Sequence, residues 1–146
     1  MITVELERVV GEYGFRATDA SGNTIRTDSS VENGGLGSGV RPMQTLLMAM
    51  GSCSGIDIVS ILKKQRQSIE AFKMKISGVR EADKEPSLWK QIDVTFYLTG
   101  NIDKEKAERA CALSIDKYCS VAETLRRAGA DITWSVIVHP SKNINA

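Results

Sequence analysis

The segment from Pro42 to Ile56 contains no charged residue, and apolar side chains continue beyond it at the spacing of one helix face. Pro42 suits a first helical turn, where its missing N–H is not needed, and the basic residues Lys63 and Lys64 suit a helix C-terminus. These signals predict a long central helix over 42–66 whose first half is buried. One chain of 146 residues would have to surround that helix by itself. Two copies that pair their helices bury both, so we expect a homodimer.

The central helix is not expected to cross a membrane, because its uncharged segment is shorter than the roughly 18 residues of a membrane span. Acidic residues between Met1 and Arg8 stand where a signal peptide needs a basic region. We therefore expect a cytoplasmic protein with no membrane partner. The net charge of +1 also argues against a nucleic acid partner, since phosphate binding requires a basic excess.

The rest of the chain predicts a single domain, 1–146, that combines strands with helices. Turn residues at Ser21-Gly22-Asn23 divide alternating segments into two or three antiparallel strands. Asp103 is a helix N-cap candidate, and Ser120–Glu123 has the pattern of a capping box. In chain order we expect a β-hairpin region (1–28), a glycine-rich loop (29–41), the central helix (42–66), strands (69–99), two helices (103–128) and a final strand (131–139).

Three cysteines are the most reactive side chains in the sequence. They are too few and too unevenly spaced for a secreted disulfide framework or a structural zinc site, and one histidine excludes a His-rich metal site. Cys53 falls on the apolar half of the central helix and is expected to face its buried side. An inert core cysteine is the alternative interpretation there, because free cysteine is often buried. Cys111 falls mid-helix and is expected to be a small core residue.

Cys119 directly precedes the predicted capping box and so stands at a helix N-terminus. The helix dipole favours a thiolate there by only about 0.3–1 kcal/mol. A guanidinium within about 4 Å contributes as much as ~4 kcal/mol at an effective dielectric near 20. An arginine partner therefore matters more to a reactive thiol than the helix end does.

The glycine-rich loop, the segment Pro42–Cys53 and the segment Tyr118–Val121 together resemble the OsmC/Ohr family, and most closely its YhfA-like branch. The resemblance covers nearly the whole chain in the same order of elements. It implies an α+β fold in which antiparallel sheets surround a long buried central helix. It also implies an intertwined homodimer with active sites at the subunit interface.

Members of this family with known activity are thiol peroxidases that act on organic hydroperoxides without a metal or other cofactor. The resemblance makes Cys53 the peroxidatic cysteine and Cys119 the resolving one. It makes Arg16 the arginine that stabilises the thiolate. An external dithiol, such as a lipoyl-type thiol, is the reductant that it implies.

Some positions depart from the family pattern. The family's peroxidases place a glutamate after the helix-opening proline, where it holds the arginine, and this chain has Met43. Glu32 in the glycine-rich loop is a candidate substitute, and Arg41 competes with Arg16 as the thiolate partner. Asp57, one turn beyond Cys53, would disfavour a thiolate if it is unpaired.

These departures leave a second hypothesis open beside the peroxidase. The chain could be a non-catalytic OsmC-like dimer that binds a small apolar or thiol ligand, or a redox sensor. A third hypothesis, a purely structural interaction protein, leaves the glycine-rich loop and the paired thiols unexplained.

Overall fold

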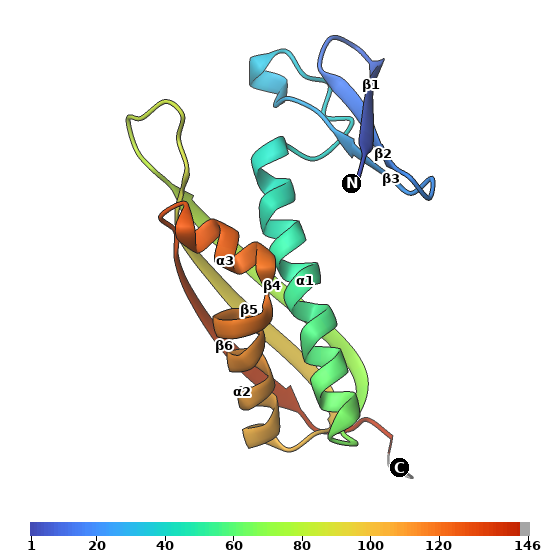
Figure 1. Ribbon diagram of the computed structural model, residues 1–146, viewed down its shortest axis with the longest axis vertical. Helices are drawn as coiled ribbons and strands as arrows, with labels where there is room; N and C mark the ends of the chain where they lie inside the picture. Colours follow the sequence, from blue (N-terminus) through green and yellow to red (C-terminus); the bar gives the residue numbers. More distant parts are fainter. Residues whose placement is uncertain (144–146) are drawn as a thin grey trace. The chain divides into compact units, whose positions relative to one another are not determined.

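The computed structural model describes residues 1–143 and has three α-helices and two three-stranded sheets (Figure 1), which confirms the α+β class. The described chain divides into two compact units, one over 1–46 and one from residue 47 onward. The prediction of a single domain over 1–146 stays a prediction. The elements are β1 (Val4–Val10), β2 (Gly14–Asp19), β3 (Thr24–Thr27), α1 (Pro42–Lys64), β4 (Ser68–Arg80), β5 (Trp89–Asn101), α2 (Lys104–Leu113), α3 (Ser120–Arg127) and β6 (Asp131–His139).

The first unit contains an antiparallel sheet with the strand order β1-β2-β3. The turn between β2 and β3 is closed by Asp19, whose carboxylate accepts hydrogen bonds from the main-chain N–H groups of Ser21 and Asn23. This is the local use of aspartate that favours a tight turn.

The glycine-rich loop is organised around Asp28, a residue that no local sequence pattern singles out. The carboxylate is only 2% exposed. It accepts hydrogen bonds from the N–H groups of Ser29, Leu36 and Ser38, and from the Ser38 hydroxyl at 2.8 Å. These bonds, those from Ser38 first, lower the pKa of Asp28 to about 2. A buried carboxylate thus fixes the path of a loop that has few apolar contacts of its own.

The second unit contains the sheet β4-β5-β6, and its topology corrects the prediction of purely antiparallel sheets. β4 and β5 pair antiparallel, whereas β5 and β6 pair parallel. The reason is the connection between them, which consists of α2, a π-helix over Ser114–Tyr118 and α3. These helices return the chain to the starting end of the sheet, as a parallel pair requires (Figure 1).

One face of α1 packs on this sheet, and two glycines bring the surfaces together. A Cβ atom on Gly51 would lie 2.7 Å from Ile76 Cδ1 and 3.0 Å from Met74 Sδ. A Cβ on Gly55 would lie 3.1 Å from the Met74 methyl group. The space beside these glycines is therefore filled by side chains of β4.

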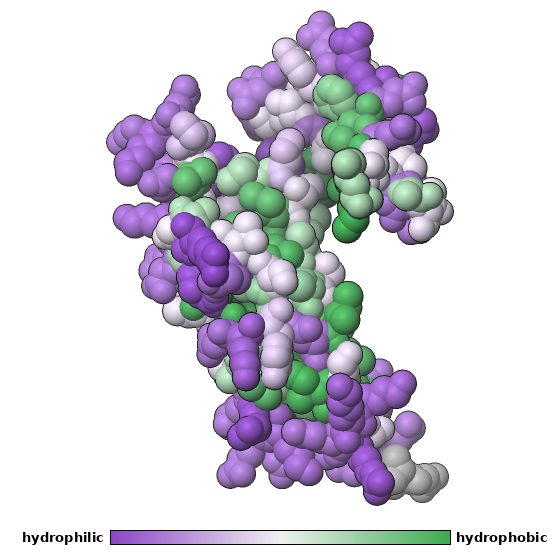
Figure 2. Space-filling view, in the orientation of Figure 1, coloured by the Kyte–Doolittle hydropathy of each residue, from purple (hydrophilic) through white to green (hydrophobic). Residues whose placement is uncertain are grey.

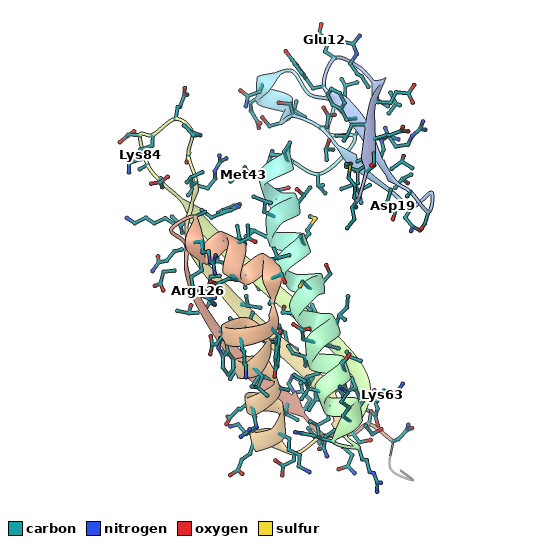
Figure 3. The ribbon with its side chains drawn as sticks, viewed as in Figure 1. Glu12, Asp19, Met43, Lys63, Lys84 and Arg126 are labelled. Atoms are coloured by element: carbon teal, nitrogen blue, oxygen red, sulfur yellow. The ribbon has the colours of Figure 1, made fainter. Side chains whose placement is uncertain are left out.

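The other face of α1 is uncovered, which corrects the prediction that the first half of the helix is buried. Met48 is 51% exposed and Ile56 is 68% exposed. Met43 lies in the first turn and Lys63 in the last (Figure 3). Apolar surface extends along the helix (Figure 2), because the sheet β4-β5-β6 packs against only its other face. The buried residues of α1 are Met50, Gly51, Ser54, Gly55, Ile58 and Leu62.

Helix α1 is also long and apolar enough to span a membrane, with a mean hydropathy of 1.7 over an 18-residue window. Asp57 ends the uncharged segment after Ile56, so that segment alone is shorter than a membrane span, whereas the whole helix is not. One third of that window is buried inside the protein. A core helix of a soluble protein passes the same test, so the hydropathy alone assigns no membrane role.

Candidate functional site: the Cys53 and Cys119 thiols

Cys53 lies on α1 between the two close-packed glycines. Its side chain is partly buried and packs against the core of the second unit. The core residues nearest to it in the helix, Met50 and Ser54, are fully buried. The contact between α1 and β4 therefore fixes the position of Cys53 relative to the sheet.

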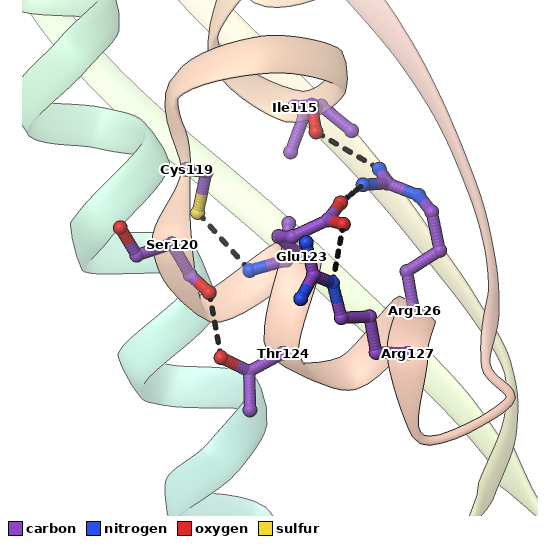
Figure 4. A network of polar contacts seen from close by, with 8 residues as sticks. Ile115, Cys119, Ser120, Glu123, Thr124, Arg126 and Arg127 are labelled. Atoms are coloured by element: carbon purple, nitrogen blue, oxygen red, sulfur yellow. Dashed lines mark hydrogen bonds and ion pairs between the residues drawn. The ribbon is translucent and has the colours of Figure 1, made fainter.

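Cys119 stands at the N-terminus of α3 and is 2% exposed. It is itself the N-cap, because its Sγ atom accepts a hydrogen bond from the Ala122 N–H at 3.3 Å (Figure 4). The predicted capping box is therefore wrong. Ser120 is the first helical residue and not the cap, and Glu123 is held by ion pairs with the arginines at the end of α3. The extended backbone of Cys119, with φ −71° and ψ 103°, is what an N-cap requires.

The two thiols lie next to each other, and this contact affects the acidity of Cys119. Burial raises the pKa of the Cys119 thiol to about 11, the Ala122 N–H partly opposes the rise, and the neighbouring Cys53 side chain adds to it. Cys119 is thus a protonated thiol at neutral pH. The helix end favours a thiolate, as expected, but its effect is smaller than the cost of burying the charge.

The third cysteine is separate in character. Cys111 is fully buried in α2, and burial raises its pKa to about 12. All three cysteines are free thiols. Among residues 1–143, no group of three His, Cys, Asp or Glu side chains could hold a metal ion.

The remaining predicted site residues belong to the first unit. Arg16 on β2 lies opposite Glu7 on β1, and its guanidinium contacts the Glu7 carboxylate at 3.1 Å. Glu32 is exposed in a 3₁₀ turn. The main-chain N–H of Arg41 donates to Gln44, and in the described chain neither Glu32 nor Arg41 forms an ion pair. Sequence reasoning missed Glu7, since only the strand register reveals that it faces Arg16.

Asp57, the carboxylate one turn beyond Cys53, is hydrogen-bonded to a residue outside α1. Its Oδ2 atom accepts a hydrogen bond from the Ser114 hydroxyl at 3.0 Å. Ser114 begins the π-helix that leads to Cys119. No local sequence signal predicts this contact, because the two residues are far apart along the chain.

Comparison with known proteins places these features in a family. A family model described as OsmC-like protein matches residues 35–135. The chain belongs to the OsmC-like family. Protein YhfA of Escherichia coli (strain K12) is 41% identical over 122 residues, which cover 83% of this chain and 87% of YhfA. This OsmC-like protein therefore has a close relative in the branch that the sequence motifs indicated.

Solved structures show the same fold. A hypothetical protein from Aquifex aeolicus VF5 superposes with a TM-score of 0.78 at 31% identity, covering 95% of this chain and 98% of that one. An organic hydroperoxide resistance protein from Legionella pneumophila superposes with a TM-score of 0.70 at 19% identity, covering 93% and 96%. At that identity the second likeness shows the shared fold alone.

Proposed function

We propose that this OsmC-like protein reduces organic hydroperoxides, with Cys53 and Cys119 as a two-cysteine centre. The observation that supports it best is the contact between two free thiols of unequal exposure. Cys53 is open enough to meet a substrate, whereas Cys119 is buried beside it. Such a pair suits a first thiol that attacks a substrate and a second that closes a disulfide.

The chemistry requires one oxidation by the peroxide, one condensation of the two cysteines that releases water, and one reduction. The Cys53 thiolate attacks the O–O bond of the peroxide, becomes a sulfenic acid and releases the alcohol after protonation. The Cys119 thiol then attacks that sulfur, an S–S bond forms, and the hydroxyl leaves as water with the Cys119 proton. An external dithiol, such as a lipoyl-type thiol, reduces the disulfide by exchange and is itself oxidised to a disulfide.

The order in which the two cysteines react follows from their surroundings. A thiol whose pKa is raised to about 11 is a poor first nucleophile at neutral pH, so Cys119 acts second. In this proposal Arg16 stabilises the Cys53 thiolate, and Glu7 holds Arg16 in place of the family glutamate that Met43 replaces. The ion pair with Glu7 is largely exposed, so it orients the guanidinium only weakly.

The uncovered face of α1 supports two further parts of the proposal. Exposed apolar residues on α1, such as Met48 and Ile56, favour an apolar hydroperoxide over hydrogen peroxide. They also favour a homodimer in which a second copy covers this face. Free thiols persist in reducing compartments, which supports a cytoplasmic location.

The test is stopped-flow oxidation of the reduced protein by cumene hydroperoxide. We expect rapid consumption of one peroxide per chain and a Cys53–Cys119 disulfide in peptide mass spectra. Cys53→Ser should abolish the reaction, and Cys119→Ser should accumulate sulfenic acid at Cys53. Cys111→Ser is the matched control and should react like the wild type. Consumption of peroxide no faster than by a free thiol would refute the proposal.

A redox sensor is the second candidate, and the presence of Met43 where the peroxidases have glutamate favours it. A sensor would form the same disulfide but would not turn over with a dithiol reductant. Repeated cycles of peroxide addition with dihydrolipoamide present separate the two functions. Sustained peroxide consumption identifies the enzyme, and a single stoichiometric oxidation identifies the sensor.

A further inference from the structure

Ser114 connects Cys119 to the helix that holds Cys53. Its main-chain carbonyl accepts the Cys119 N–H at 2.7 Å. Its hydroxyl lies 3.0 Å from Asp57 Oδ2 and 3.2 Å from the Ser54 carbonyl, both on α1 in the turn that follows Cys53. One residue therefore contacts the backbone of one cysteine and the helix of the other.

The burial of Ser114 makes this contact energetically significant. The residue is fully buried, and a buried hydroxyl without a partner carries a large desolvation penalty. Its single proton faces two acceptors on α1, and the bond to a carboxylate is the stronger kind. The contact thus holds the start of the π-helix against α1.

The π-helix over Ser114–Tyr118 continues directly from α2, and the Ser114 N–H donates to carbonyls of α2. Its far side is held by Arg126, which donates to the Ile115 carbonyl at 2.9 Å (Figure 4). π-Helices are rare and often occur at functional sites, and this one is held on both sides by tertiary contacts. Cys119 is the first residue after this π-helix, so the geometry of the π-helix sets the position of Cys119.

We propose that Asp57 and Ser114 are positioning residues that hold Cys119 beside Cys53 and so set how readily the two thiols close to a disulfide. This inference rests on the proposed two-cysteine function. In the closing step an S–S bond forms, the S–O bond of the Cys53 sulfenic acid breaks, and water leaves. Asp57 and Ser114 touch neither the peroxide nor the reacting sulfur atoms. Their effect is on geometry alone.

The test is the equilibrium between the dithiol and oxidised glutathione, which needs no peroxide. The reaction forms the Cys53–Cys119 disulfide and two molecules of reduced glutathione, and its constant gives the effective concentration of one thiol at the other. We expect Asp57→Ala and Ser114→Ala each to lower that constant about tenfold, as the loss of one well-placed hydrogen bond would. The equilibrium constant is measured by peptide mass spectrometry of the protein in glutathione buffers of known composition.

Two further variants show whether a lower constant comes from the lost hydrogen bond, from the lost charge or from a non-specific effect of substitution in α1. Asp57→Asn removes the charge but keeps a side-chain oxygen for the Ser114 hydroxyl, so it should stay within about threefold of the wild type. Ser52→Ala is the matched control, because the Ser52 hydroxyl bonds only to carbonyls of its own helix, at Met48 and Ala49. Its constant should not change. An unchanged constant in Asp57→Ala, or an equal loss in Asp57→Asn, would overturn the inference.

A kinetic measurement separates this inference from the proposed function. With cumene hydroperoxide, Asp57→Ala should form sulfenic acid at least as fast as the wild type but close the disulfide about tenfold more slowly. Sulfinic acid at Cys53 should then increase, since the sulfenic acid persists longer. If the wild type ignores peroxide yet the glutathione constants change as expected, the peroxidase proposal fails and the positioning role stands. If Ser114→Ala does not fold, the two Asp57 variants decide the question.

Discussion

The order in which the three cysteines react with iodoacetamide follows from their burial and acidity. Burial raises the pKa of Cys119 from the ordinary value of 9.0 to about 11, which lowers its thiolate fraction about 100-fold at neutral pH. A more basic thiolate is a better nucleophile, with a Brønsted slope near 0.4–0.5, so roughly tenfold of that loss is recovered. The net chemical effect is about tenfold slower reaction than for an ordinary thiol. An exposed fraction of only 2% slows Cys119 further.

The assay is alkylation of the fully reduced protein between pH 7 and pH 10.5, with timed quenching and mass spectrometry of the three cysteine peptides. Cys53 should be labelled first because it is the only one of the three that is not fully buried. Cys119 should follow at least tenfold more slowly, and Cys111, with a pKa near 12, should be last. The rate at Cys119 should rise with each pH unit up to the highest pH tested, because its pKa lies above that range.

Cys53→Ser is the control for the contact between the thiols. Without the Cys53 thiol, the charge repulsion that helps to raise the pKa of Cys119 is removed while burial remains. The labelling rate at Cys119 should therefore increase modestly and not approach that of a free thiol. Labelling of Cys119 before Cys53 at pH 7, or a rate that levels off near pH 8, would refute the assignment of Cys119 as the buried, protonated partner.

Two predictions concern the elements that support the site. Gly51→Val should destabilise the protein by about 1–3 kcal/mol in urea unfolding, because its methyl groups enter space held by β4 side chains. Ser52→Val on the exposed face should change the free energy of unfolding by less than about 0.5 kcal/mol. Asp28 has a lowered pKa, so it stabilises the folded state above about pH 4 and loses that effect as the pH falls toward 2. In Asp28→Asn the thermal unfolding midpoint should lose the part of its pH dependence that comes from Asp28. Proteases should also cut the loop over 29–41 more readily. Equal pH profiles of the midpoint for the variant and the wild type would contradict this prediction.

The elements themselves were largely predictable because they depend on local patterns. Proline, the apolar spacing and the terminal lysines define α1, which begins at Pro42 and ends at Lys64, just inside the predicted 42–66. Period-2 alternation identifies the strands, and turn residues separate the first three. The motifs around Cys53 and Cys119 also indicated the OsmC/Ohr family, which the family match confirms.

What the sequence could not determine are the contacts between distant segments. Parallel pairing of β6 with β5 depends on where the connecting helices lie, and a periodic pattern has no information about strand direction. Cys119 is the cap because the extended backbone conformation falls at Cys119, one residue before the predicted cap at Ser120. Such shifts are set by packing, which competes with local propensity and here prevails over it.

The sequence by itself determined the inventory: three thiols, a long apolar helix and a glycine-rich loop. Only the tertiary structure decided which groups meet, because a hydrogen bond between Asp57 and Ser114, or a contact between Cys53 and Cys119, requires residues far apart in the chain to share one position in space. It also decided that burial governs the acidity of Cys119. Desolvation of a charge depends on everything packed around it, whereas the helix end that favours the thiolate is a local and weaker effect.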